Sequence, residues 1–244
     1  MSNFIPMSKL SVNINKIATI RNARGGAMPN VVQFAVDCER FGADGITIHP
    51  RPDERHITTK DTYDLKEVVT TEFNIEGYPD ARFMQLIKDL RPTQATLVPD
   101  PPGVLTSNAG WDTIQHFDFL QEICQTIKDL GVRTSIFIEP KNELIENASK
   151  LGVERIELYT GPYAEHFPIK REEAIAAYAE ATKFAVNHGL GINAGHDLSL
   201  ENLRFFKQSL VQLDEVSIGH ALISDALYLG IENTIQRYKL LLAD

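Results

Sequence analysis

Two histidines and two arginines fall within eight consecutive residues, in the stretch that begins at His49 and ends at His56. Arginine guanidinium groups bind anions, and histidine exchanges protons near neutral pH. His49 still belongs to a short apolar run, which predicts a strand end, whereas Asp53 and Glu54 are typical of a solvated loop. The stretch therefore predicts a site that binds an anionic group and moves protons.

Further ionisable residues also end short apolar runs. Glu76 closes the run 73–76, and a lone carboxylate there is a candidate general base if burial raises its pKa. An ion pair with an arginine is the alternative role. Glu157 has the same setting and suits an orienting or charge-stabilising group. His196 follows Gly195, where a missing side chain is expected to let a ligand approach the backbone.

Two segments are candidates for phosphate binding. Gly219 and His220 come between an apolar run and a helical pattern, and backbone N–H groups at such a helix start bind phosphate. His220 alone is also compatible with an ordinary helix start. Arg21 and Arg24 belong to an expected loop that is either a second phosphate clamp or a solvated tip. The polar residues predicted at strand ends are Asn13, Asn15, His49, Glu76, Glu139, Glu157, Asn193, His196, Gly219 and His220.

Short apolar segments and longer periodic segments alternate along the whole chain, eight of each. Such alternation predicts parallel strands joined by helices. The expected strands are 10–15, 45–49, 73–76, 95–98, 134–138, 155–159, 191–194 and 215–218. The expected helices are 30–41, 61–70, 79–90, 112–130, 141–151, 171–188, 199–208 and 221–242.

Eight units in 244 residues predict an α/β protein, a (β/α)8 TIM barrel that forms a single domain over residues 1–244. A doubly wound sheet is the competing architecture, but no Gly-x-Gly-x-x-Gly follows the first expected strand. In a closed barrel the carboxyl ends of all strands meet at one rim, where barrel enzymes carry out catalysis. The polar strand ends are therefore expected to share one pocket.

Composition and missing motifs limit the functions that are compatible with this sequence. The net charge of −9 and a pI near 5.3 disfavour nucleic acid and anionic membranes as partners. No signal peptide and no apolar run long enough for a membrane span is found, and neither cysteine has metal-site spacing, so we expect a cytoplasmic protein without a metal. No cofactor fingerprint or strand-six Schiff-base lysine is present. Acid–base chemistry on a phosphorylated small molecule remains.

Five segments taken together resemble the pyridoxine 5'-phosphate synthase family, in order and over essentially the whole chain. They are 12–25, 42–56, 74–76, 193–196 and 218–221. The resemblance implies a (β/α)8 barrel that assembles as a homo-octamer and needs no metal or organic cofactor. It also implies the reaction: 3-amino-2-oxopropyl phosphate condenses with 1-deoxy-D-xylulose 5-phosphate to form pyridoxine 5'-phosphate, phosphate and water.

The resemblance implies a role for each matching residue. His49 and Glu76 would accept protons, His196 would donate one, and Glu157 would stabilise charge. The implied route is imine formation, phosphate elimination, enolisation, aldol-type ring closure and dehydration. The implied ligands of the aminoketone phosphate are Asn13, Arg21, Gly219 and His220, those of the sugar phosphate are Arg51, His56 and Thr106, and Asp197 stands at a further substrate-binding position.

This sequence departs from the family pattern at three places. Asn15-Lys16 replaces an Asp-His pair, Asp197 replaces a glycine after His196, and the loop 99–103 diverges just before Thr106. Two other functions are compatible with the residues alone. One is a different phosphosugar isomerase or epimerase on the same barrel, and the other is a barrel that binds a phosphorylated ligand without turnover.

Overall fold

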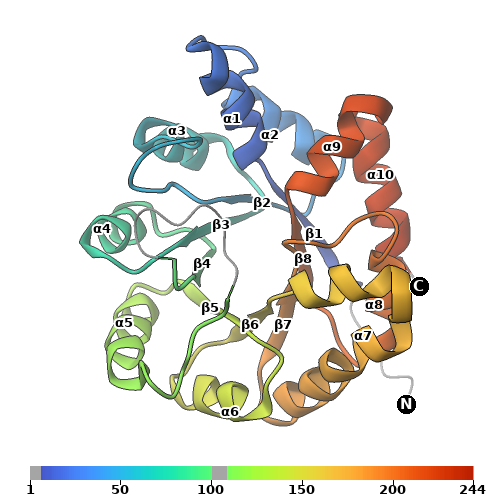
Figure 1. Cartoon of the computed structure of the whole chain (residues 1–244). Helices are drawn as coiled ribbons and strands as arrows, with labels where there is room; N and C mark the ends of the chain where they lie inside the picture. The colour runs from blue at the N-terminus through green and yellow to red at the C-terminus, as the bar shows by residue number, and fades with distance from the viewer. Residues whose placement is uncertain (1–6, 101–108, 244) are drawn as a thin grey trace.

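The computed structural model describes residues 7–100 and 109–243. Parallel strands pair in sequence order and close on themselves, because β1 bonds to both β2 and β8 (Figure 1). The predicted (β/α)8 barrel is therefore confirmed. The strands are β1 (Lys9–Asn13), β2 (Gly45–Ile48), β3 (Glu72–Gly77), β4 (Gln94–Leu97), β5 (Arg133–Ile138), β6 (Arg155–Leu158), β7 (Gly191–Ala194) and β8 (Glu215–Ile218).

Helices surround this ring of strands on the outside (Figure 1). Ten are found in the described part of the chain, two more than the sequence predicts. They are α1 (Asn15–Arg24), α2 (Val31–Arg40), α3 (Thr59–Val68), α4 (Ala81–Leu90), α5 (Phe117–Asp129), α6 (Asn142–Lys150), α7 (Gly161–Asn187), α8 (Leu203–Ser209), α9 (His220–Leu229) and α10 (Ile231–Leu242).

The two additional helices have different causes. The predicted strand 10–15 ends early, and α1 begins at Asn15, so Arg21 and Arg24 lie on a helix and the prediction of a loop was wrong. Only Ile17 and Ala18 are buried on α1, too few apolar residues for a helical pattern. The predicted helix 221–242 is divided into α9 and α10 at Gly230, which has a φ of 76°.

Helix α7 is longer than its predicted range of 171–188. It begins ten residues earlier at Gly161, and Pro168 precedes a break at Lys170 (φ −148°, ψ 68°). Proline cannot donate the helical hydrogen bond, which interrupts the backbone ladder. The part of α7 that precedes this break was therefore not predicted from the sequence.

The apolar core lies between the strands and the helices. Outward-facing strand residues such as Val12, Ile46 and Ile75 are fully buried there. The inward-facing residues, in contrast, are largely polar: Thr47 and Asn74 pair in register and hydrogen-bond at 3.3 Å. The lumen of the barrel is therefore a polar interior and not a second apolar core.

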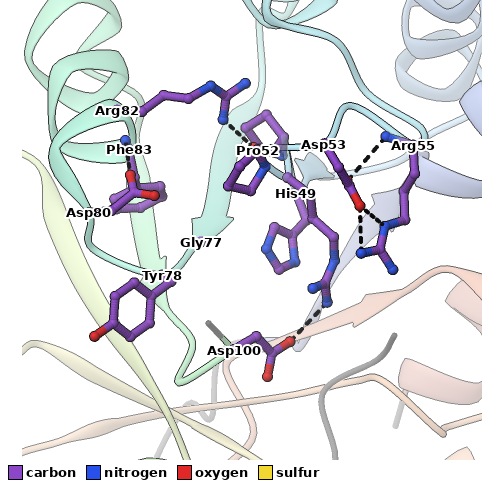
Figure 2. A pocket seen from close by; sticks show the side chains of 12 residues that line it. His49, Pro52, Asp53, Arg55, Gly77, Tyr78, Asp80, Arg82, Phe83 and Asp100 are labelled. Carbon is purple, nitrogen blue, oxygen red and sulfur yellow. Dashed lines mark hydrogen bonds and ion pairs between the residues drawn. The ribbon is translucent and has the colours of Figure 1, made fainter. Parts of the chain in front are cut away.

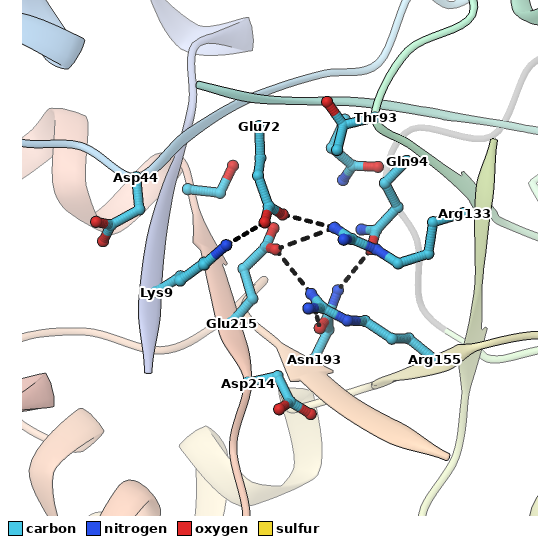
Figure 3. A network of polar contacts seen from close by, with 12 residues as sticks. Lys9, Asp44, Glu72, Thr93, Gln94, Arg133, Arg155, Asn193, Asp214 and Glu215 are labelled. Carbon is cyan, nitrogen blue, oxygen red and sulfur yellow. Dashed lines mark hydrogen bonds and ion pairs between the residues drawn. The ribbon is translucent and has the colours of Figure 1, made fainter. Parts of the chain in front are cut away.

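An ion-pair network fills the amino-terminal end of the lumen (Figure 3). Buried Glu215 pairs with Arg155 at 2.9 Å, and Arg133 contacts Glu72 at 2.5 Å. Asn193 accepts a hydrogen bond from Arg155 at 3.1 Å. The prediction that Asn193 belongs to the catalytic rim was therefore wrong: strand register with Glu215 places it in this lower layer.

Candidate active site

His49 lies directly after β2, where the chain leaves the barrel for the loop to α3. Its side chain is 7% exposed, and its backbone N–H donates to Asn15 Oδ1 at 2.9 Å. Burial, followed by the charges of Arg51 and His56, holds the pKa of the imidazole well below its usual value. His49 is therefore a neutral imidazole that can accept a proton.

Asn15 explains one departure from the family pattern. Its backbone N–H donates to Asn13 Oδ1 at 3.1 Å, while its own side-chain oxygen holds the backbone of His49. An amide oxygen accepts this bond as a carboxylate oxygen would. Lys16, the next residue, is exposed on α1, and its charge contributes to the lowered pKa of His56.

Arg51, near the start of the same loop, and His56, near its end, are also buried. Burial and then the Arg51 charge lower the pKa of His56 to about 4, and its Nδ1 accepts from the backbone N–H of Ile57 at 2.9 Å. Arg51 is 7% exposed and pairs with Asp100 at 2.8 Å. The guanidinium is thus held in place by a carboxylate from the segment after β4.

A cavity of about 290 Å³ opens beside this loop. Figure 2 shows His49 and Asp53 on one side of it and Tyr78 and Asp80 on the other. Three guanidinium groups and three carboxylates border the space, so it suits a polar, charged ligand. The lining residues are His49, Pro50, Arg51, Pro52, Asp53, Arg55, Gly77, Tyr78, Asp80, Arg82, Phe83 and Asp100.

Two carboxyl groups, on the non-adjacent strands β3 and β6, lie at the mouth of the lumen. Burial raises the pKa of Glu76 to about 8, although Arg51 opposes the shift, and Asn13 Nδ2 donates to its Oε2 at 3.4 Å. Burial and then the charge of Glu76 raise the pKa of Glu157 well above its usual value. Glu157 Oε2 is buried and has no hydrogen-bond partner in the part of the chain that the structure describes. Both carboxyl groups therefore keep their proton to higher pH than an exposed glutamate does.

His196 and Asp197 follow β7. His196 Nδ1 lies 2.8 Å from Asp197 Oδ2, and this hydrogen bond is the main cause of a raised pKa for His196. A Cβ on Gly195 would stand 1.9 Å from the backbone oxygen of Ser217 on β8. The neighbouring strand therefore already requires glycine at this position, and the role in ligand approach stays a prediction.

Asn13 and Gly219 bring the ends of β1 and β8 together. A Cβ on Gly219 would lie 3.2 Å from side-chain atoms of Asn13. Helix α9 begins at His220, whose side chain is exposed, while Gly219 is buried. The first N–H groups of α9 thus lie beside the Asn13 amide, as the predicted phosphate site requires.

The Arg21 side chain has an intramolecular partner. Its guanidinium makes two hydrogen bonds with Asp61, at 2.5 and 2.7 Å, and one with the His56 carbonyl at 3.2 Å. Asp61 also caps α3 through Thr58. Arg21 therefore ties α1 to α3, while Arg24, one turn later, is exposed.

Sequence reasoning missed several residues that position the loop between β2 and α3. Asn22 donates to the His56 carbonyl at 2.8 Å and the Arg55 carbonyl at 3.2 Å, and Arg82 donates to the Pro50 carbonyl at 2.7 Å. Asp61 and Asp100 were missed as well. Nothing in the local pattern marks them, because their partners are 32 to 49 residues away in sequence.

Three further observations concern Thr106, metal sites and membrane spans. Thr106 lies outside the described residues. No cluster of three or more histidine, cysteine or acidic side chains able to hold a metal is found among residues 7–100 and 109–243. In the same ranges, no helix is long and apolar enough to span a membrane.

Residues 10–244 match the family described as pyridoxal phosphate biosynthesis protein PdxJ. The chain belongs to this family. A pyridoxine 5'-phosphate synthase from Bacteroides fragilis is 60% identical over 233 residues, covering 96% of this chain and 98% of the relative. One from Cytophaga hutchinsonii is also 60% identical, over 95% of this chain and 98% of the relative. The resemblance predicted from the sequence is confirmed, and with it a place for this PdxJ-family chain in vitamin B6 biosynthesis.

Solved structures of other barrels share the fold at low identity. A tryptophan synthase from M. tuberculosis superposes with a TM-score of 0.67 at 10% identity, over 97% of this chain and 94% of that chain. The 3-keto-L-gulonate-6-phosphate decarboxylase from Vibrio cholerae gives 0.66 at 9% identity, over 97% and 98%. These matches support the architecture of the PdxJ-family chain and say nothing of its substrates.

Proposed function

We propose that this chain condenses 3-amino-2-oxopropyl phosphate with 1-deoxy-D-xylulose 5-phosphate, forming pyridoxine 5'-phosphate, phosphate and water. The observation that carries the proposal is membership of the PdxJ family, with 60% identity to pyridoxine 5'-phosphate synthases over nearly the full length. The arrangement of acids, bases and cations at the barrel mouth supports it residue by residue.

His49 and Glu76 are the proposed proton acceptors. Burial and Arg51 disfavour the charged form of His49, so its imidazole is neutral at rest and one ring nitrogen is free of a proton before the reaction. Glu76, with a pKa of about 8, is poised to exchange protons near neutral pH. Enolisation and ring closure each require removal of a proton from carbon or oxygen. His49 and Glu76 are the proposed acceptors of these protons.

His196 is the proposed proton donor, and Glu157 the proposed charge-stabilising group. Dehydration releases hydroxide unless the leaving oxygen receives a proton, and the raised pKa of His196 keeps a proton available. Glu157 is close enough for its charge to raise the pKa of His196. Glu157 Oε2 has no hydrogen-bond partner in the described chain and is available to the substrate, and the cationic intermediate of imine formation would favour the ionised carboxylate beside it.

The aminoketone phosphate is proposed to bind where β1 and β8 end. Asn13 and the backbone of Gly219 and His220 supply neutral donors, and the N-terminus of α9 favours an anion. Arg21 would have to share its guanidinium with Asp61. Arg24, on the last turn of the same helix, is exposed.

The sugar phosphate is proposed to bind across the β2 side of the mouth. Arg51 and His56 belong to the loop that borders the cavity, and Thr106 completes the set implied by the family. Lys16 is exposed nearby and acts electrostatically on His56. An ammonium there can serve a phosphate as the family's imidazole does.

The proposal extends to assembly and compartment. Helices α1 and α9 contact each other and carry exposed apolar side chains, Ile20 (45% exposed), Leu227 (72%) and Tyr228 (90%), which we term the α1–α9 surface. Burying such a surface between copies supports the homo-octamer implied by the family. Cys38 and Cys124 are buried and unpaired, in keeping with a reducing cytoplasm.

The test is direct reconstitution. Purified protein is incubated with both substrates, and product fluorescence and inorganic phosphate are followed together. Product and phosphate should appear in equal amounts and only when both substrates are present. His49→Ala should lower kcat by about 10²–10⁴-fold, the range for a general base, while Ser149→Ala on the surface of α6 should leave it unchanged.

Other results would support the competing functions. Interconversion of a single sugar phosphate without the aminoketone would identify an isomerase or epimerase. Binding of both phosphates without any turnover, together with silent His49→Ala and Glu76→Ala variants, would identify a ligand-binding barrel. Either result overturns the synthase proposal.

A further inference from the structure

The His196–Asp197 pair is held by contacts on both sides of Asp197. The two side chains meet at 2.8 Å, each about one-third exposed at the mouth of the barrel. The backbone N–H of Asp197 donates to buried Thr160 Oγ1 at 3.2 Å, and its carbonyl accepts from Asn202 Nδ2 at 3.2 Å. The carboxylate is therefore presented to His196 from an anchored backbone.

The contact determines the form of the imidazole. A carboxylate accepts hydrogen bonds and cannot donate, so the proton of this bond is on His196 Nδ1. The outer nitrogen, Nε2, is then the position that gains or loses a proton. Fixing one ring nitrogen in this way orients the ring and selects its protonated sites.

The charged groups around His196 favour its cation. Asp197 acts from the same segment, Glu157 from β6 and Asp100 from the end of β4, and burial is the opposing effect. Burial and then the Asp197 charge raise the pKa of the Tyr159 phenol, which lies near the pair after the end of β6. His49, in contrast, is surrounded by Arg51, Arg55 and His56 and is neutral.

We propose that Asp197 is a positioning residue that orients the His196 imidazole through its hydrogen bond to Nδ1, so that His196 delivers a proton from Nε2 during the reaction. The proton-donor part rests on the proposed function, whereas the pairing itself does not. The proton leaves Nε2 for the departing oxygen, and solvent returns one afterwards. Acid and base roles are thereby assigned to two histidines by the charges of their neighbours.

The same geometry gives Asp197 a role other than phosphate binding. Its backbone N–H is used by Thr160, and its carboxylate would repel a phosphate placed against it. Pairing with His196 explains how a carboxylate is accommodated at a position where the family has glycine. The aspartate adds a charge partner that a glycine cannot supply.

The pairing is tested in the resting protein by NMR titration of ¹⁵N-labelled histidine, with His196 assigned by its loss in His196→Gln. Wild-type His196 should titrate above the usual histidine range. Asp197→Asn, which keeps the shape and removes the charge, should lower the midpoint by about one pH unit. Glu201→Gln, a matched change at an exposed carboxylate four residues later, should leave it unmoved. An unchanged midpoint in Asp197→Asn overturns the pairing.

The catalytic consequence is tested by the pH profile of kcat. In Asp197→Asn the alkaline limb should move to lower pH by the same amount, with KM within about twofold, and Asp197→Glu should restore it. A uniform loss of kcat at every pH, with the limb in place, overturns the positioning role. If the midpoint shifts but no synthase activity is found with wild type, the pairing stands and the proposed function fails.

Discussion

The carboxyl group of Glu76 lies at the mouth of the lumen, where few polar groups solvate it. Asn13 supplies one weak hydrogen bond at 3.4 Å, and the nearest helpful charge is that of Arg51, which is itself paired with Asp100. Desolvation therefore dominates, and the pKa rises to about 8. Placing a base at this site costs stability, because the folded protein resists its ionisation.

This cost makes a prediction about pH. Below pH 4.5, the usual pKa, Glu76 is protonated in both the folded and unfolded states and costs nothing. Between pH 4.5 and about 8 the unfolded state loses the proton first, so stability falls by about 1.4 kcal/mol per pH unit. Glu76→Gln should therefore stabilise the protein more at pH 8 than at pH 5, by about 3 kcal/mol.

Urea denaturation at pH 5, 6.5 and 8 measures this difference. Glu122→Gln on the exposed face of α5 is the control and should show no trend with pH. An equal effect of Glu76→Gln at all three pH values would mean that the carboxyl group ionises normally.

At the scale of elements, the loop between β2 and α3 is held by its neighbours rather than by its own sequence. Asn22 on α1 and Arg82 on α4 bind its carbonyl groups from opposite sides, and Arg21 links it to Asp61 on α3. These bonds fix the positions of Arg51 and His56. Helix α1, absent from the pattern of the sequence, thus serves the site directly.

The junction of β7 and β8 allows a sharp test. Alanine at Gly195 would place a methyl group 1.9 Å from the Ser217 carbonyl oxygen, so one strand must move. We expect Gly195→Ala to cost at least about 2 kcal/mol in the free energy of unfolding and to displace His196 and Asp197. Gly26→Ala, with no atom within 4 Å of the new methyl, is the matched control.

Thermal and denaturant unfolding followed by circular dichroism compare the two variants. Equal stabilities would show that β8 can yield to the methyl group and that Gly195 is not needed for packing.

At the scale of the whole molecule, the polar lumen leads to the candidate site, whereas exposed apolar side chains on the outer helices are available for contact between copies. The lumen is closed at one end by Glu72, Arg133, Arg155 and Glu215 and opens at the other onto the candidate site. The α1–α9 surface lies outside the barrel, where Tyr228 is 90% exposed. Large apolar groups in that position suit contact between copies.

Tyr228→Asp should weaken the proposed assembly, because a charge in an apolar interface lacks a partner. Size-exclusion chromatography with light scattering should show a smaller species than wild type. Val211→Asp, at an apolar residue 43% exposed elsewhere on the molecule, should keep the wild-type mass. Wild-type mass in Tyr228→Asp would remove this surface from the interface.

The number and order of the strands, the closed barrel and the family could all be predicted from the sequence alone. Apolar periodicity is a local property, and the eight runs appear in it directly. It also predicted that His49, Glu76, Glu157 and His196 come from strand ends, because parallel strands in a closed barrel end at one rim.

The protonation properties of these side chains, in contrast, depend on the tertiary structure. Burial in the folded barrel is the main cause of the lowered pKa of His49, and the geometry of the hydrogen bond to Asp197 is the main cause of the raised pKa of His196. The pairs Arg21–Asp61 and Arg51–Asp100 join residues 40 and 49 positions apart. A pKa depends on burial and on nearby charges in space, so the sequence identifies the ionisable groups and the fold sets which of them hold a proton.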